Sequence, residues 1–350
     1  MCGIAGIIGP NPSEEKLQKM LQAQKHRGPD HTGSYIDPGF AALGHNRLAI
    51  IDLSPEANEP FMDNSGRYYL SFNGEIYNYK ELKEELKSHY KFKTSSDTEV
   101  LLAAYIHWGK ECLHKFNGMF SFAIWDSAEK KLFAARDRFG VKPFYYSEAN
   151  EGLYFSSEIK ALKNVIFDTQ VNQKVWANYF SYGSYGLPEE TFYKNIKQLP
   201  GGHFLEFSEG KLHITKWYDF VSAVKNISSN TPFQEVKEKY LALLKDSINL
   251  RFRADVPVAF NISGGVDSSL LLALVNLSED KKDINAYTFH TKDARYDELP
   301  WVEQMIATTQ NPLKKSAFFS FRSRAISPGD KQFSGRAIRW NSYTRLFCHF

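Results

Sequence analysis

The hydrophobic pattern of the first two thirds of the chain predicts many short strands separated by a few helices. Residues 2–9 form an apolar run, and Ser13 precedes a segment in which Leu17, Met20 and Leu21 recur at helical spacing. This mixture is typical of two packed sheets flanked by helices, an α+β fold. Further strands are expected at 41–52, 67–72, 119–125, 131–135, 153–156 and in a pair within 202–217, and further helices at 79–88, 100–108, 157–162 and 173–182.

Polar residues interrupt this pattern in three places that bear on function. Residues 73–78 (NGEIYN) read as a turn that caps the next helix, because Asn-Gly favours turns. Ser96 and Glu99 have the spacing of a capping box, which puts Asp97 in a first helical turn, where a carboxylate compensates the helix dipole without any other role. Arg47 interrupts an apolar strand, so it needs an anionic partner, and an internal salt bridge would suffice.

The pattern changes after the polar residues 221–231, where we place a linker between two domains. Pro232 opens a helix, and a strand–loop–helix–strand succession of the βαβ type follows, which predicts a parallel sheet. The buried stripe of the first helix is expected to consist of Val236, Tyr240, Leu243, Leu244 and Ile248. The later strands are expected at 256–262 and 285–290, and the later helices at 270–276 and 297–308.

Length and composition fit two domains of an ordinary soluble protein. The 350 residues are 43% hydrophobic and 24% charged, and no stretch approaches the about 20 apolar residues of a membrane span. The apolar opening lacks the basic residues that begin a secretory signal. Cys2, Cys112 and Cys348 suggest neither a disulfide framework nor a metal cluster, and the histidines lack metal-ligand spacing. We therefore expect a cytoplasmic protein without a structural metal.

The net charge of +3 is unevenly distributed along the chain. The residues after Glu303 carry a net +7, with Asp330 as their sole acidic residue, which leaves −4 for the rest. A basic tail can bind nucleic acid. The same composition also arises from a truncated or frame-shifted gene product, or from a lineage-specific tail. Nucleic-acid binding is therefore the least favoured hypothesis.

A cysteine at position 2 is one candidate for nucleophilic chemistry. Methionine before a small residue is readily trimmed, so we expect the mature chain to begin at Cys2. That residue would then carry both a thiol and a free α-amine, which titrates near about 7.7–8.0 and can take the thiol proton. Position alone is weak evidence, so this hypothesis depends on the motifs that follow.

The sequence SGGVDSS at 263–269 predicts an anion-binding loop. A strand that passes into a helix through two glycines directs backbone N–H groups and a helix N-terminus at one place. Ligands bind at this carboxyl end of a strand in open α/β sheets, and three serines add hydroxyl donors. The segment is not a Walker sequence, and Asp267 would repel phosphate unless Mg²⁺ or an ordered loop compensates.

These motifs resemble those of known enzyme families. Residues 263–268 resemble the pyrophosphate loop of the ATP pyrophosphatases, which cleave ATP to AMP and pyrophosphate while adenylylating a carboxylate or carbonyl oxygen. Segments of the first half resemble class II glutamine amidotransferases, and the two halves in this order resemble the glutamine-hydrolysing asparagine synthetases. The matching segments of the first half are MCGIAG at 1–6, HRGPD at 26–30, HNRL at 45–48, NGEIYN at 73–78, SD at 96–97 and RDRFG at 136–140.

The resemblance implies an N-terminal αββα sandwich of the N-terminal-nucleophile (Ntn) hydrolase type, followed by an α/β nucleotide-binding domain with a parallel sheet. The family also carries a motif of the type Ser-Gly-Glu-Gly-x-Asp-Glu, which does not occur here. We therefore expect a complete glutaminase domain, an incomplete second domain and an impaired synthetase step. The expected divisions are the glutaminase domain at 1–220, the linker at 221–231, the partial synthetase domain at 232–316 and an unmatched basic tail at 317–350.

For the first domain, the resemblance implies glutamine hydrolysis. Cys2 would attack the side-chain amide with its own α-amine as the base, and Asn73 with the Gly74 N–H would form the oxyanion hole. A zwitterionic substrate needs one fixed cation and one fixed anion. The expected glutamine-binding residues are Arg47 for the α-carboxylate, and Asp97 with Glu75 for the α-ammonium.

For the second domain, the resemblance implies ATP as a substrate, bound as its Mg²⁺ complex, with no tightly bound cofactor. Asp267 is a possible ligand of that Mg²⁺. ATP would activate aspartate as β-aspartyl-AMP, and ammonia travelling inside the protein would displace AMP to give asparagine. A homodimer is a possible assembly, and no membrane partner is expected. The expected ATP-binding residues are Ile262, Ser263, Gly264, Gly265, Asp267, Ser268 and Phe289.

Two other functions fit the same sequence. One is an ATP-dependent amidotransferase that acts on another carboxylate, because the family's acceptor contacts lie largely in the unmatched region. The other is a remnant that acts only as a glutaminase, or that merely binds nucleotide or partners. A non-catalytic remnant has no reason to keep Cys2, Arg47, Asn73 and Asp97 together.

Overall fold

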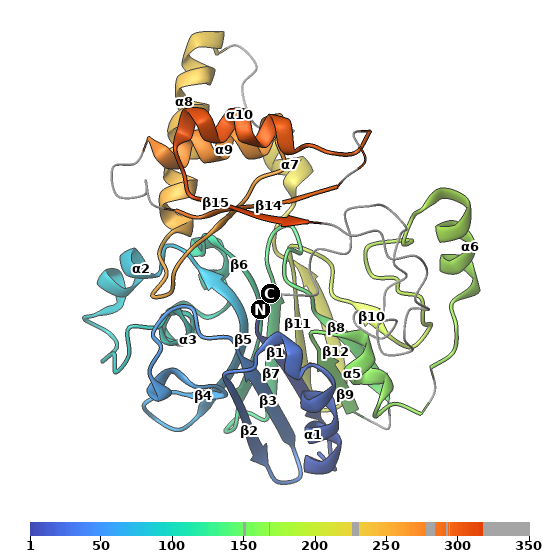
Figure 1. The fold of residues 1–350 in the computed structure, drawn as a ribbon. Coiled ribbons are helices and arrows are strands. Elements are labelled where there is room, and N and C mark those ends of the chain that lie inside the picture. The colour runs from blue at the N-terminus through green and yellow to red at the C-terminus, as the bar shows by residue number, and fades with distance from the viewer. Residues whose placement is uncertain are drawn as a thin grey trace. The chain divides into compact units, whose positions relative to one another are not determined.

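The computed structural model describes residues 1–149, 152–167, 169–225, 231–277, 284–291, 293 and 295–317 (Figure 1). The described residues form two compact units, one up to residue 225 and one from residue 231 onward. Residues 318–350, nearly all of the predicted basic tail, lie outside this description. No described helix is both long and apolar enough to cross a membrane.

The first unit contains two six-stranded sheets, and every neighbouring pair of strands within them is antiparallel. One sheet has the order β10 (Lys197–Gln198), β8 (Tyr145–Ala149), β9 (Gly152–Ser156), β1 (Gly3–Ile8), β3 (Ala41–Arg47) and β2 (His31–Asp37). The other has the order β12 (Lys211–Lys216), β11 (His203–Ser208), β7 (Lys131–Arg136), β6 (Gly118–Asp126), β5 (Tyr68–Ile76) and β4 (Phe61–Met62).

Three hydrophobic cores hold this unit together and confirm the predicted αββα layering (Figure 1). The core between the two sheets contains the fully buried Trp125, Phe144 and Phe155. The other two cores join helices to the outer face of each sheet. The helices are α1 (Glu14–Ala23) and α5 (Ile159–Lys163) on the first sheet, α2 (Tyr79–Leu86), α3 (Asp97–Trp108) and α4 (Cys112–Lys115) on the second, and α6 (Gln173–Tyr182), α7 (Phe220–Lys225), η1 (Lys25–Arg27), η2 (Pro55–Ala57) and η3 (Gly109–Glu111) elsewhere.

Several predicted boundaries in this unit were wrong. β5 runs on to Ile76, so residues 73–76 are strand rather than turn, because pairing with β6 continues as far as Ile76 opposite Gly118. β3 ends at Arg47 instead of residue 52. The first part of the predicted linker 221–231 is helical, because α7 occupies residues 220–225. Residues 226–230 lie outside the described part of the chain.

The predicted capping box was also wrong, although its helix exists. Ser96 caps α3 by accepting a hydrogen bond from the Thr98 N–H at 3.1 Å. Glu99 does not return to Ser96, because its carboxylate accepts instead from the N–H groups of Lys93 and Thr94. This bonding fixes the chain that enters α3, and therefore the position of Asp97.

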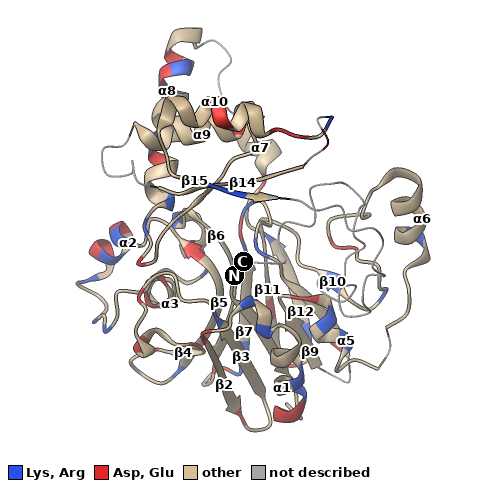
Figure 2. Cartoon of the chain, in the orientation of Figure 1, with Lys and Arg blue, Asp and Glu red and all other residues tan. Residues whose placement is uncertain are grey.

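The second unit contains the predicted parallel sheet, with three strands in the order β13, β14 and β15. The ladder includes only two residues of the predicted strand 256–262, because β14 pairs with Phe260 and Asn261 alone. Lys314 and Lys315 give β15 its basic character (Figure 2). The elements are α8 (Phe233–Arg251), β13 (Phe260–Asn261), α9 (Val266–Asn276), β14 (Ala286–His290), α10 (Leu299–Thr309) and β15 (Leu313–Ala317).

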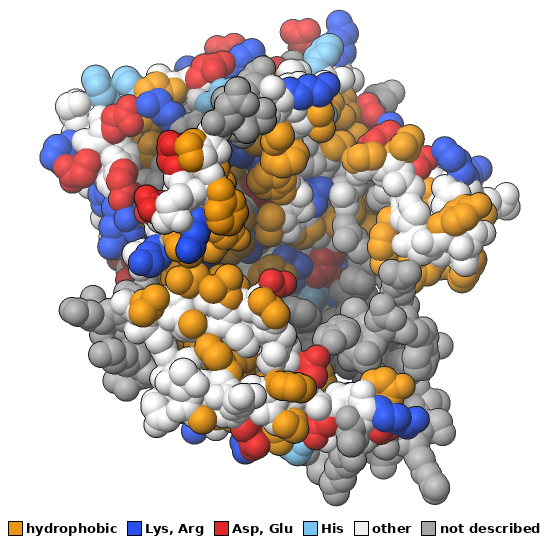
Figure 3. Space-filling model, turned by 90° about the horizontal axis from the view of Figure 1, so that it is seen from above, with side chains coloured by type: hydrophobic (Ala, Val, Ile, Leu, Met, Phe, Trp, Pro, Cys, Tyr) orange, Lys and Arg blue, Asp and Glu red, His pale blue; other side chains and the backbone are white. Residues whose placement is uncertain are grey.

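The predicted buried stripe of α8 was largely wrong. Val236, Tyr240 and Leu243 are 47, 57 and 59% exposed, whereas Ile248 is buried. The reason is that, within the described residues, α8 packs by its C-terminal part, where Ile248 and Leu244 contact α9. In the view from above (Figure 3), exposed hydrophobic side chains are interspersed with charged ones.

Candidate active site

The C-terminal half of β5 directs alternate backbone N–H groups away from β6. The Phe72 N–H donates to Glu59 Oε2, and the Ile76 N–H donates to Asp97 Oδ2 at 2.9 Å. Residues two apart in a strand point their backbone groups the same way, so the Gly74 N–H between them also points outward. Within the described residues this N–H has no hydrogen-bond acceptor. The strand edge thus holds one open donor between two occupied ones.

The pairing of Gly74 with β6 supports this orientation. Gly74 lies opposite Phe120, whose N–H donates to Asp137 Oδ2 at 3.2 Å and whose carbonyl accepts from the Asp137 N–H at 2.8 Å. Phe120 therefore does not bond to Gly74. A Cβ at position 74 would lie 2.3 Å from the Met119 carbonyl oxygen, so no other residue fits without a shift.

Asn73 supplies a second unused donor beside Gly74. Its side chain is fully buried, and neither Nδ2 nor Oδ1 has a hydrogen-bond partner in the described part of the chain. A buried amide without partners is costly and uncommon in native proteins. Asn73 and Gly74 line the same pocket, so a ligand oxygen placed there would meet two donors.

Cys2 lies at the start of β1 with its side chain against the end of β3. The Leu48 N–H donates to Sγ at 3.4 Å, and the Arg27 Nε donates to the Cys2 carbonyl at 2.8 Å. Burial, and then the Glu59 carboxyl, raise the pKa of the Cys2 thiol to about 11. Met1 precedes Cys2 here, and burial lowers the pKa of its α-amine. The thiol therefore needs a base and a favourable charge before it can act as a nucleophile.

Arg47 ends β3, the neighbour of β1, and is 6% exposed. Its terminal nitrogens donate to the Ser54 carbonyl and Asn58 Oδ1, both at 2.8 Å, and to the Asp52 carbonyl. These acceptors are neutral, and no carboxylate of the described residues forms an ion pair with Arg47. The internal salt bridge considered from the sequence is therefore not found, and the guanidinium charge stays available to an anionic ligand.

Asp97 begins α3, but it does more than compensate the helix dipole. The carboxylate is 5% exposed and binds the Ile76 N–H on β5. Burial, and then the nearby Glu75, raise the pKa of Asp97 to about 7. A cation beside such a carboxylate would favour its ionised form. Asp97 is therefore suited to an ammonium ligand.

The predicted glutaminase residues come together in one pocket of about 360 Å³ in the first unit. They reach it from four separate parts of the chain: the start of β1, the end of β3, the middle of β5 and the start of α3. Such a volume suits a small ligand held by a few polar groups. The residues brought together are Cys2, Arg47, Asn73, Gly74, Glu75 and Asp97.

The sequence analysis missed Glu59, which also lines this pocket. Its Oε1 accepts from Thr98 Oγ1 at 3.2 Å, and its Oε2 lies 3.5 Å from His45 Nε2. His45 Nε2 in turn lies 2.9 Å from the Phe72 carbonyl. Burial raises the pKa of Glu59 well above its ordinary value and lowers that of His45 to about 3. Together the two side chains bind both backbone groups of Phe72, where a neighbouring strand would otherwise pair.

Lys142 is the other charged residue of the pocket that the sequence analysis missed, and it is 5% exposed. The matched segment 136–140 stops two residues before it, so the motif pointed to the correct loop. No comparable signal marks Glu59, which lies in a polar stretch and is buried only by tertiary packing. In both cases the side chain is distant in sequence from Cys2.

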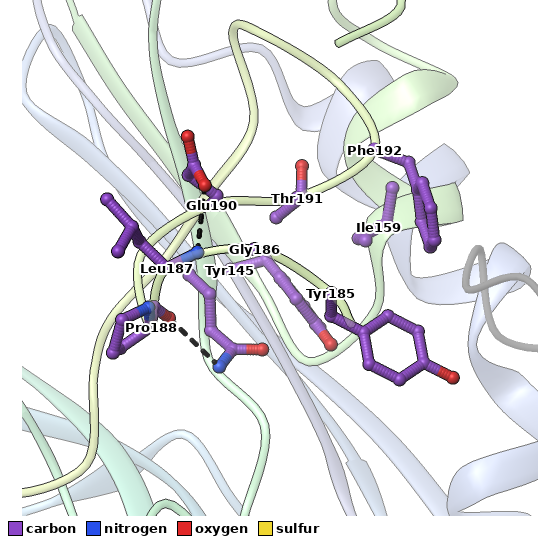
Figure 4. Close-up of a pocket in the computed structure, with 10 residues that line it drawn as sticks. Tyr145, Ile159, Tyr185, Gly186, Leu187, Pro188, Glu190, Thr191 and Phe192 are labelled. Carbon is purple, nitrogen blue, oxygen red and sulfur yellow. Dashed lines mark hydrogen bonds between the residues drawn. The ribbon is translucent and has the colours of Figure 1, made fainter. Parts of the chain in front are cut away.

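A second pocket, of about 230 Å³, lies near α6 and is lined by residues of α5, β8 and the loop 185–198 (Figure 4). In it the Leu187 N–H donates to Glu190 Oε2 at 2.8 Å, and Gln198 Nε2 donates to the Pro188 carbonyl at 3.4 Å. These bonds join the loop to itself. Its lining contains no cysteine, lysine, arginine or histidine, so we do not place the chemistry there.

In the second unit, the predicted ATP loop follows β13 and closes through its own hydroxyl groups. The Ser263 N–H donates to Ser268 Oγ at 3.3 Å, and Ser268 Oγ donates to the Gly265 carbonyl at 3.1 Å. Gly264 has φ of +74°, and a Cβ there would lie 2.8 Å from Trp301 Cβ. The loop therefore requires glycine at this position.

The remaining predicted ATP residues surround the same strand ends. α9 begins at Val266, so Asp267 and Ser268 are in its first turn rather than in a loop, and no side chain caps it. Ile262 is buried and bonds to β14, which also carries Phe289 near its carboxyl end. An uncapped helix N-terminus at the carboxyl ends of parallel strands can bind an anion. Among the described residues, no cluster of three or more His, Cys, Asp or Glu side chains could hold a metal ion.

The αββα sandwich, with a cysteine at the start of its first strand, places the first unit in the class of Ntn-hydrolase folds. The chain belongs to the glutamine amidotransferase domain family, which matches residues 1–218. A second family, described as asparagine synthase, matches residues 239–329.

Curated relatives extend over both matched regions. The chain is 36% identical over 282 residues to "Asparagine synthetase [glutamine-hydrolyzing] 1" of Bacillus subtilis, covering 78% of this chain and 44% of that protein. It is 35% identical over 331 residues to "Putative asparagine synthetase [glutamine-hydrolyzing] 2" of Methanocaldococcus jannaschii, covering 87% and 62%. It is also 33% identical over 291 residues to "Amidase chry2" of Gibberella zeae, covering 79% and 43%. The chain thus spans about half the length of the curated relatives that it matches.

Proposed function

We propose that the first unit hydrolyses glutamine to glutamate and ammonia, with Cys2 as the nucleophile. Once Met1 is removed, the α-amine of Cys2 takes the thiol proton, and Sγ attacks the side-chain amide carbon. The oxygen of the tetrahedral intermediate accepts hydrogen bonds from Asn73 Nδ2 and the Gly74 N–H. Ammonia leaves, and water hydrolyses the thioester. The observation that carries this proposal is the pair of donors without partners at Asn73 and Gly74, in the pocket that Cys2 lines.

The same pocket can recognise both charged ends of glutamine. The α-carboxylate binds the guanidinium of Arg47, which has no ion-pair partner among the described residues. The α-ammonium binds Asp97, with Glu75 beside it. A substrate with both charges then fixes its amide between Cys2 and the oxyanion donors.

For the second unit, we propose that ATP, as its Mg²⁺ complex, binds at the loop Ser263–Ser268 and activates aspartate as β-aspartyl-AMP. Ammonia from glutamine displaces AMP, and the products are asparagine, glutamate, AMP and pyrophosphate. The asparagine synthase match and the names of the relatives support this acceptor. The chain spans 44% and 62% of the length of these two relatives, so the complete reaction is proposed here and tested below.

The test supplies the full chain with amide-¹⁵N glutamine, aspartate, ATP and Mg²⁺, and follows the products by NMR. Labelled asparagine with an equal amount of AMP supports both steps. Glutamate and labelled ammonia without AMP support the glutaminase alone, and AMP release with a different carboxylate identifies another acceptor. Cys2→Ala should abolish glutamine hydrolysis but keep any synthesis from free ammonium, so unchanged hydrolysis by this variant would refute the proposal.

A further inference from the structure

The segment between β7 and β8 contains the matched RDRFG motif, to which the proposed function gives no role. Arg136 is 3% exposed, and its guanidinium donates to the carbonyls of Lys142, Leu199 and Gly140, each at 2.6 Å. Gly140 has φ of +66°, and a Cβ there would lie 3.0 Å from Arg136 Cζ. One buried cation therefore fixes the backbone course of this loop.

A buried anion fixes the same loop from the other side. Asp137 is 1% exposed, its Oδ1 accepts from the N–H groups of Phe139 and Val141, and its Oδ2 accepts from the N–H of Lys142 at 3.0 Å. Asp137 Oδ2 also binds the Phe120 N–H, opposite Gly74. The loop is therefore attached to the strand pair that carries the oxyanion donors, and both backbone groups of Lys142 are bonded within it.

This loop delivers the side chain of Lys142 to the pocket of Cys2. Lys142 is 5% exposed and lines the pocket, and its ammonium has no hydrogen-bond or ion-pair partner among the described residues. Burial without a partner disfavours a charged ammonium. The groups that favour its charge are Glu75 and Cys2, which line the same pocket, and Asp137, whereas Arg27 disfavours it. General packing does not require a buried lysine whose charge is favoured by the proposed nucleophile.

We propose that Lys142 is a positioning residue that stabilises the Cys2 thiolate, and that the loop 136–142 exists to hold it there. The inference rests on the proposed function, since the thiolate is the attacking species in glutamine hydrolysis. When the thiol proton moves to the α-amine, the negative charge left on Sγ faces the Lys142 ammonium. The proton stays on the amine until the leaving ammonia takes it.

Other groups near Cys2 also change the pKa of its thiol. Glu59 raises the pKa of the thiol, whereas the Leu48 N–H, the α-amine and Lys142 lower it. Arg27 binds the Cys2 carbonyl, so it acts on the backbone next to the thiol. Among the groups that lower the pKa of the Cys2 thiol, Lys142 acts through a charged side chain. Without it, no side-chain cation of this group would oppose the increase in thiol pKa that Glu59 causes.

The test measures the rate at which iodoacetamide alkylates Cys2 in the full chain across a pH series, read on the N-terminal peptide by mass spectrometry. Lys142→Met keeps the length of the side chain and removes the charge, and it should raise the pH midpoint by about one unit, which is about tenfold slower alkylation at neutral pH. Lys142→Arg should restore most of the rate. Lys131→Met, which removes a surface lysine paired with Glu206, should change nothing and is the matched control.

An unchanged midpoint in Lys142→Met, or an equal shift in Lys131→Met, would overturn the inference. Lys142→Gln provides a second neutral variant in case the methionine variant does not fold, and circular dichroism checks both. A glutaminase assay run in parallel separates the two hypotheses. If the wild-type protein hydrolyses glutamine but Lys142→Met leaves the alkylation midpoint unchanged, the role of Lys142 alone is refuted. If Lys142→Met shifts the midpoint but the wild-type protein does not hydrolyse glutamine, the proposed function alone is refuted.

Discussion

At the residue scale, the most informative feature is a side chain that the fold leaves without partners. Asn73 is fully buried and its amide bonds to nothing among the described residues, although neighbouring buried polar groups such as Thr98 and Glu59 are bonded. Native proteins rarely tolerate this unless a ligand completes the bonding. The residue type was visible in the sequence, but its lack of partners became visible only with the fold.

We expect Asn73→Ala to lower kcat for glutamine hydrolysis by about 10²–10³-fold with little change in KM, because one oxyanion donor is lost while the contacts to the charged ends of glutamine remain. Steady-state kinetics over a range of glutamine concentrations measures both constants. Asn64→Ala, which removes an exposed amide bonded to the Lys91 carbonyl, is the control. A rise in KM without a fall in kcat would show that Asn73 serves binding instead.

Asp97 predicts a pH dependence of glutamine binding. Burial raises its pKa to about 7 in the free pocket, so the carboxylate is largely protonated at pH 6 and largely ionised at pH 8. Because only the ionised form attracts an ammonium, KM for glutamine should fall severalfold as pH rises from 6 to 8. Measured KM values at several pH values test this, and Asp97→Asn should have a high KM that no longer follows this trend. A KM that rises with pH in the wild type would contradict the assignment.

At the scale of elements, β5 contains both the main error of the sequence analysis and its main success. Asn-Gly was read as a turn because local propensity favours one, yet pairing with β6 keeps both residues in the strand. The glutaminase residues predicted from the six short motifs nevertheless line one pocket, because such motifs are recognisable without knowledge of their conformation. Glu59 and Lys142 were missed because their burial depends on contacts between segments distant in sequence.

Glu59, which binds the edge of β5, leads to a prediction for the pH dependence of stability. Burial raises the pKa of Glu59 well above its ordinary value of 4.5, so the native state keeps a proton that the unfolded chain releases. Wild-type stability therefore falls as pH rises above about 4.5, through the range in which only the unfolded state has lost this proton. Glu59→Gln removes this dependence, so the variant should gain stability relative to the wild type between pH 5 and pH 7.

Urea unfolding midpoints of the two proteins at pH 5 and pH 7 measure this difference. Glu15→Gln is an informative control, because a hydrogen bond from Lys19 lowers the pKa of the exposed Glu15 carboxylate. As pH rises, the stability of this variant relative to the wild type should therefore fall, and by less than the gain in Glu59→Gln. Glu59→Ala should be less stable at both pH values by about 1–3 kcal/mol, since the Phe72 N–H would lose its acceptor. A Glu59→Gln variant that loses stability relative to the wild type as pH rises would contradict the raised pKa.

At the scale of the whole molecule, each of the two units has its own sheets, hydrophobic cores and candidate site. The first unit contains the Cys2 pocket. The second contains the SGGVDSS loop at the ends of a three-stranded parallel sheet. The division into a glutaminase domain and a synthetase domain remains a prediction. Each candidate site lies within one unit, so damage to one site should leave the chemistry of the other intact.

Gly264→Ala tests this independence. Alanine at φ of +74° is strained, and its Cβ would lie 2.8 Å from Trp301 Cβ, so the loop should shift and ATP affinity should fall at least about tenfold. Glutamine hydrolysis should stay at the wild-type rate. Titration with ATP, followed by calorimetry, and a glutaminase assay provide the two readouts. Gly210→Ala is the matched control, because this glycine has φ of +71° and a Cβ added there would have no other atom within 4 Å, so ATP affinity should stay unchanged.

The alternation along β5 has a consequence for how this protein can change over generations. The open N–H of Gly74 faces the pocket because it stands two residues from Phe72 and two from Ile76, whose N–H groups are both taken by carboxylates. Adding or removing a single residue in this strand would turn the open donor to the opposite side, however well the new sequence packed. The descendants of this protein can therefore exchange side chains that do not line the pocket more readily than they can change the length of this strand.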